Sequence, residues 1–244
     1  MADTGPTYQI LEDQFNAHGV SATVENRAVG GTLACGWAES PSALADAARD
    51  AFGDDGPDFV WYTLGGNDLG NDDDYHACLE EAESFADAQA CLFASSEKVM
   101  DCTVTLLEAL WEAFPNAKVG QCNYDASCVR GDCGSTVAAF QGGAFCGWGT
   151  NVTCMNSLLE YWQSIYVDEL HAKYSSEDNR YTGMRILGAV QEAAGIPGAS
   201  VGTLVHGVGA RCDWELGCIH PIYGTAAADA VGAAFWDLWL APLV

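Results

Sequence analysis

The sequence is poor in basic residues. It has nine lysines and arginines against 34 aspartates and glutamates, which gives a formal charge of −25 over 244 residues. A surface of this charge repels nucleic acid and anionic membranes, so nucleic-acid binding is excluded as a main function. The sequence also lacks an uninterrupted apolar run of about 18 residues, and we therefore expect no membrane span.

Closely spaced cysteine pairs are also missing. None of the eleven cysteines belongs to a C-x-x-C unit. Cysteines spread along the chain in this way predict disulfides in an oxidising compartment, hence a secreted protein, and the odd number leaves at least one thiol unpaired. A zinc site is the weaker alternative, because the spacings of Cys122, Cys128 and Cys133 and of Cys146 and Cys154 are not those of usual zinc ligands. The sequence indicates no cofactor.

The most informative stretch is an apolar run that ends at four turn-forming residues. Phe59–Leu64 is aromatic and β-branched and predicts a strand buried on both faces. Gly65–Gly66–Asn67–Asp68 follows at its carboxyl end, where open α/β sheets bind their ligands. An Asn there can direct its amide N–H at a substrate oxygen. The alternative is a helix-capping turn, because Asn and Asp cap helices well.

Strands and helices are predicted to alternate along the chain. Apolar periodicity indicates helices over residues 8–16, 43–52, 72–114, 155–170, 181–194 and 231–238. Strands are expected over residues 20–29, 59–64, 117–123 and 200–208. This order predicts an α/β protein with a central parallel sheet between two helical layers. We expect one domain over residues 1–244, with insertions at 71–115 (helical) and 122–150 (Cys-rich).

Three segments that contain glycine and polar residues follow predicted strands, at Asn26–Thr32, Gly65–Asp68 and Gly217–Pro221. Asn26–Thr32 (NRAVGGT), Gly65–Asp68 (GGND) and Ile219–Pro221 (IHP) resemble the second, third and fifth conserved blocks of the SGNH/GDSL hydrolases, in the same order. The resemblance extends over about residues 20 to 235. It implies a flavodoxin-like α/β/α fold and hydrolysis of carboxylic esters, such as an acylated carbohydrate or a lipid.

The resemblance also implies roles for individual residues. Gly31 would donate its backbone N–H to an oxyanion hole and Asn67 its side-chain amide. His220 would be the general base, a role that suits a group whose ordinary pKa is near neutrality. His220 is preferred to His18, His76, His171 and His206 because it stands beside a proline, just before the last helix.

The sequence departs from the family pattern at two places. Only Ala2–Gly5 has any likeness to the Gly-Asp-Ser block, with Thr4 in place of the serine, so we expect the first strand and its serine to precede residue 1. Met1 does not begin a signal peptide, so we expect any secretion leader to have been removed. The family has an Asp where this chain has Gly217, so Asp213 or Glu215, in a loop that a Cys212–Cys218 bridge would hold, could orient His220 instead.

These departures favour a second hypothesis. The chain could be a catalytically inactive protein of the same fold that binds a glycan or a partner protein. The expected partner is otherwise a small-molecule or glycan ester substrate.

Overall fold

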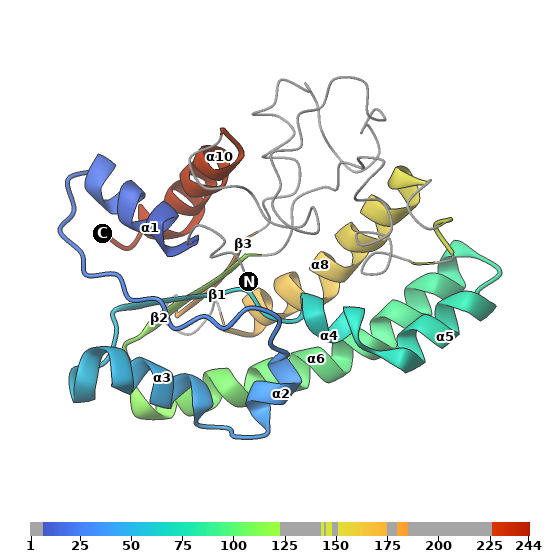
Figure 1. Cartoon of the computed structure of the whole chain (residues 1–244), viewed down its shortest axis with the longest axis horizontal. Helices are drawn as coiled ribbons and strands as arrows, with labels where there is room; N and C mark the ends of the chain where they lie inside the picture. The colour runs from blue at the N-terminus through green and yellow to red at the C-terminus, as the bar shows by residue number, and fades with distance from the viewer. Residues whose placement is uncertain (1–6, 123–142, 144, 148–150, 175–179, 185–225) are drawn as a thin grey trace. The chain divides into compact units, whose positions relative to one another are not determined.

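A computed structural model describes residues 7–122, 143, 145–147, 151–174, 180–184 and 226–244 (Figure 1). The chain forms two compact units. The first comprises Met1–Asn26, Tyr124–Glu160 and Met184–Val244, and the second comprises Arg27–Asn123 and Tyr161–Gly183. Helices and strands are mixed along the described residues, which confirms the α/β class. The three-layer arrangement and the extent of a single domain over 1–244 stay predictions.

The sheet has three described strands, β1 (Phe59–Tyr62), β2 (Lys118–Cys122) and β3 (Tyr181–Met184), in the order β1-β2-β3. β1 and β2 are parallel, with Phe59 opposite Lys118 and Tyr62 opposite Gln121. The strands predicted at 59–64 and 117–123 are therefore confirmed. Only Tyr62 of β1 is buried, although burial on both faces was expected. The reason is that β1 is at the edge of the sheet that the structure describes, where it has a neighbour on one side.

The long helix α6 (Phe85–Ala113) organises the second unit. Its buried stripe includes Val99, Leu106 and Leu110, at the helical spacing that predicted it. A capping box at Ser84 begins the helix, which ends before Pro115. Helices α2 (Ala34–Ala38), α3 (Ala43–Phe52) and α5 (Asp73–Glu81) lie along it, as Figure 1 shows. The short elements η1 (Gly53–Asp55) and α4 (Gly66–Gly70) complete the unit before β2.

Three further helices confirm the helices predicted near the start of the chain, over residues 155–170 and near its end. Helix α8 (Val152–Tyr174) continues from the first unit into the second. The first unit also contains α1 (Thr7–Ala17) and α10 (Ala226–Phe235), which is followed by one π-helical segment, η3 (Trp236–Leu240). α1 and α10 pack closely at Gly232, where an added Cβ would lie 2.8 Å from the side chains of Ile10 and Gln14.

Two secondary-structure predictions were wrong. Residues 20–29 form no strand: they link the two units, Val29 is 61% exposed, and no described strand pairs with them. A high β propensity describes side chains that fit a half-buried sheet surface, and here that surface is missing. The helix predicted over 181–194 begins as strand β3 instead, because β2 offers hydrogen bonds such as Val119 N–H to the Arg180 carbonyl (2.6 Å). The strand predicted at 200–208 lies outside the described residues.

Three disulfides join cysteines of the described residues: Cys35–Cys102, Cys78–Cys91 and Cys146–Cys154. The last pair cannot serve as zinc ligands while it is bridged. The bridges are compatible with an oxidising compartment. None of the helices in the described part of the chain has both the length and the apolar content that a membrane crossing requires.

Candidate functional site: two turns at the end of strand β1

The turn after β1 depends on a glycine with an unusual backbone conformation. Gly65 has φ +102°, which L-residues rarely adopt, and it precedes α4, the helix that carries Asn67 and Asp68. An added Cβ at Gly65 would lie 3.0 Å from both Tyr166 Cε1 and Val99 Cγ1. The position therefore requires glycine for its conformation and for lack of space. The expected helix-capping role of this turn is found in Asp68, whose carboxylate binds the first N–H groups of another helix, α2, whereas α4 itself has no side-chain cap at Gly65.

The second turn, at Gly30–Gly31, immediately precedes α2. Gly31 has φ +81° and is exposed, and no atom would lie within 4 Å of a Cβ added there. The Thr32 hydroxyl donates to the Val29 carbonyl at 2.9 Å and closes the turn. The Gly31 N–H makes no hydrogen bond to any residue that the structure describes.

Three hydrogen bonds join the first turn to the second turn and to the start of α2. Asn67 Nδ2 donates to the Thr32 carbonyl at 3.1 Å. The Asp68 carboxylate accepts the backbone N–H groups of Ala34 (2.8 Å) and Cys35 (2.9 Å). Asp68 therefore caps α2, which begins at Ala34, and does so from a segment 34 residues further along the chain. The folded second unit thus brings together Gly31 and Asn67, the two oxyanion-hole donors that the sequence analysis proposed.

This arrangement could bind an anionic oxygen. An amide nitrogen carries two hydrogens. The contact with Thr32 uses one of them, and Asn67 Nδ2 makes no other hydrogen bond within the described residues. The second hydrogen and the Gly31 N–H are donors on adjoining turns. Such fixed donors stabilise the negative charge that develops on a carbonyl oxygen during acyl transfer.

A buried hydroxyl network underlies the strand ends next to the first turn. Tyr62 Oη, at the end of β1, donates to Gln121 Oε1 at 2.9 Å, and Tyr181 Oη donates to the same oxygen. Burial raises the pKa of Tyr62 and of Tyr181 well above the ordinary tyrosine value, and for Tyr62 the nearby Tyr181 adds to the effect. Both hydroxyls therefore stay protonated and hold the strand ends in register. The apolar strand pattern did not indicate this network.

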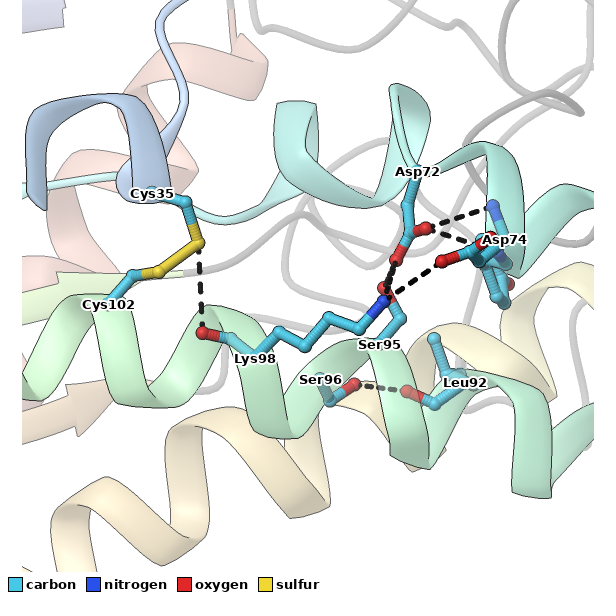
Figure 2. A network of polar contacts seen from close by, with 9 residues as sticks. Cys35, Asp72, Asp74, Leu92, Ser95, Ser96, Lys98 and Cys102 are labelled. Carbon is cyan, nitrogen blue, oxygen red and sulfur yellow. Dashed lines mark hydrogen bonds and ion pairs between the residues drawn. A yellow bond between two sulfur atoms is a disulfide. The ribbon is translucent and has the colours of Figure 1, made fainter. Parts of the chain in front are cut away.

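The residues after α4 are fixed to α6 by the Asp72 carboxylate, as Figure 2 shows. It accepts the Ser95 hydroxyl at 2.5 Å and the Tyr75 N–H at 3.2 Å, and Lys98 Nζ lies 3.7 Å away. Burial alone would raise the pKa of Asp72, but these hydrogen bonds and Lys98 outweigh it and lower the pKa below its ordinary value. The same view shows the Cys35–Cys102 disulfide, by which α2 is joined to α6.

The described histidines have structural partners. His18 stacks on Trp236 with ring centroids 3.7 Å apart and donates to the Gln14 carbonyl. His76 Nε2 lies 3.2 Å from the Gly70 carbonyl oxygen, and His171 Nδ1 accepts the Gly183 N–H at 3.3 Å.

The other predicted site residues, His220, Asp213, Glu215 and Thr4, lie outside the described residues, as does the rival His206. Their roles stay predictions. No cluster of three or more His, Cys, Asp or Glu side chains suited to a metal ion occurs among the described residues.

Comparison with known proteins adds little. No family model matches the sequence, and no curated protein matches it. A solved structure that is similar in part is phospholipase A1 from Streptomyces albidoflavus NA297, with 18% sequence identity over 85% of this chain and 76% of that chain, and a TM-score of 0.42. A TM-score this low does not establish a shared fold, so the function proposed below is based on the residues of this chain.

Proposed function

We propose that the chain is a hydrolase of carboxylic esters of the SGNH type. The observation that supports this most is the hydrogen-bonded pairing of the Gly30–Gly31 turn with the Asn67–Asp68 turn at the end of a parallel strand. Two of the three sequence blocks that resemble the family contain these turns, whose residues Thr32 and Asn67 are 35 positions apart in the chain. Substrates would be esters of an acylated carbohydrate or a lipid.

The proposed reaction assigns the resembling residues their family roles. A hydroxyl, for which Thr4 is the candidate within this chain, attacks the ester carbonyl carbon while His220 takes its proton. Gly31 N–H and Asn67 Nδ2–H stabilise the resulting oxyanion. The C–O bond to the alcohol then breaks, His220 returns the proton to the alcohol, and water repeats the sequence to release the acid. Asp213 or Glu215 would orient His220.

The test is release of p-nitrophenol from short acyl esters by the whole chain. We expect His220→Ala to lower the rate by roughly a hundredfold or more, because general-base catalysis commonly contributes that much. His76→Ala is the matched control and should retain the rate, since the His76 ring makes a hydrogen bond to the Gly70 carbonyl and lies against the neighbouring Tyr75 ring. Equally slow hydrolysis by the unmodified chain and His220→Ala would contradict the proposal.

The second candidate function is binding without catalysis, to a glycan or to a partner protein. The missing Gly-Asp-Ser block and Gly217 favour it. The measurement that separates the two is a glycan array with and without O-acetyl groups, performed alongside the ester assay. Binding of a glycan by a chain that hydrolyses no ester would favour this second function.

A further inference from the structure

Asp68 is a buried carboxylate that no cation neutralises in the described part of the chain. It is 8% exposed, and its two oxygens accept the Ala34 and Cys35 N–H groups at 2.8 and 2.9 Å. No lysine, arginine or histidine of the described residues forms an ion pair with it. Backbone N–H groups at the start of a helix therefore provide the compensation that a buried charge requires.

The Asp68 carboxylate lies close in the chain to one donor of the candidate oxyanion hole and binds a segment that is close to the other. Asp68 follows Asn67 directly, and Ala34 comes three residues after Gly31. The contact of Asp68 with the start of α2 therefore joins the segment that carries the Gly31 N–H to the segment that carries the Asn67 amide. The Thr32 contact with Asn67 is a single hydrogen bond between neutral groups, whereas Asp68 makes two charge-assisted ones. Charge-assisted hydrogen bonds are roughly twice as strong as neutral ones.

A covalent bond holds the same backbone from another direction. Cys35, whose N–H binds Asp68, is bridged to Cys102 on α6. The start of α2 is thus held by Asp68 on the first turn and by the disulfide on the long helix (Figure 2 shows the disulfide).

We propose that Asp68 is a positioning residue of the ester hydrolase, and that it sets the distance between the Gly31 N–H and the Asn67 amide. The inference rests on the proposed function. Donors of an oxyanion hole must lie about 2.7–3.1 Å from the developing oxyanion, so small displacements matter. A misplacement of about 1 Å can cost roughly a hundredfold in rate.

The informative substitution is Asp68→Asn, which keeps the size of the side chain. It replaces one carboxylate oxygen by an NH₂ group that would face a backbone N–H, so one hydrogen bond is lost and the charge is removed. We expect kcat for p-nitrophenyl acetate to fall roughly 10- to 100-fold, with KM changed less than about twofold, because the affected contact is made in the transition state. Asp58→Asn is the matched control: it is an exposed carboxylate without a described side-chain contact and should retain kcat.

A double-mutant cycle with Asn67→Ala distinguishes positioning from general stability. If Asp68 acts through Asn67, Asp68→Asn should lower kcat less than about threefold once Asn67 is already alanine. The inference would be overturned if Asp68→Asn and Asn67→Ala lowered kcat independently, so that their factors multiplied in the double variant, or if Asp68→Asn had the same kcat as Asp58→Asn. Either outcome would leave the proposed ester hydrolase function standing. An unmodified chain without esterase activity would overturn the proposed function and this inference with it. Should Asp68→Asn not fold, Asp68→Glu, which moves the carboxylate by one methylene, must show the same fall in kcat.

Discussion

Replacement of Gly65 by alanine should destabilise the second unit strongly. Two separate costs follow from the structure. The backbone φ of +102° is unfavourable for any residue with a Cβ, and such strain costs about 1–3 kcal/mol. The new Cβ would also lie 3.0 Å from Tyr166 and Val99, and overpacking of this kind costs about 1–3 kcal/mol.

The neighbours of Gly65 have little freedom to move away. Tyr166 is fully buried, its hydroxyl is hydrogen-bonded to Thr103 at 2.6 Å, and its ring stacks on Trp162. Val99 is 3% exposed within α6. The packing cost should therefore be realised nearly in full, and we expect a total loss of about 2–6 kcal/mol in the free energy of unfolding.

The assay is urea unfolding followed by tryptophan fluorescence, with Gly31→Ala as the matched control. Gly31 has a similar positive φ of +81°, but no atom lies within 4 Å of its added Cβ, so only the backbone cost applies. Gly65→Ala should thus lose about 1–3 kcal/mol more than Gly31→Ala. Equal losses in the two variants would refute the packing argument, and no loss in either would refute the backbone argument as well.

Three further predictions concern hydrogen bonds around this site. Folding lowers the pKa of Asp72, so its contribution to stability is present above the unfolded pKa and is lost as the pH falls through the folded pKa. Thermal melts between pH 2 and 7 should show this extra acid sensitivity in the unmodified chain and in the control Asp73→Asn, but not in Asp72→Asn. Identical pH profiles for the three proteins would contradict the prediction. Thr103→Val should cost about 0.5–1.5 kcal/mol in urea unfolding because it removes the buried hydrogen bond between the Thr103 and Tyr166 hydroxyls. Because both substitutions remove the same bond, Thr103→Val with Tyr166→Phe should cost less than the sum of the single variants, and an additive loss would contradict this. Ser84→Ala should cost about 0.5–2 kcal/mol by removing the cap of α6, measured in the same way, and an unchanged midpoint would mean that the cap adds nothing.

The regular elements were predictable where a periodic pattern coincided with a clear boundary. The buried stripe of α6 ends before Pro115, as the sequence predicted, whereas the helical stretch expected from residue 72 is divided into α5 and α6, the second of which is capped by Ser84. The β1 pattern was equally clear because Gly65 and Gly66 follow it. In contrast, residues 20–29 and Tyr181–Met184 depended on whether a neighbouring strand was present, which local sequence does not reveal.

The sequence alone determined the α/β fold class and two of the candidate site residues. Asn67 was selected by its place after a predicted strand and by the resemblance to the SGNH/GDSL blocks, and Gly31 by that resemblance alone. Only the tertiary structure decided that the two turns meet. It also made Asp68 the cap of α2, since its carboxylate binds N–H groups more than 30 residues away in the chain. Long-range hydrogen bonds of this kind leave no local sequence pattern.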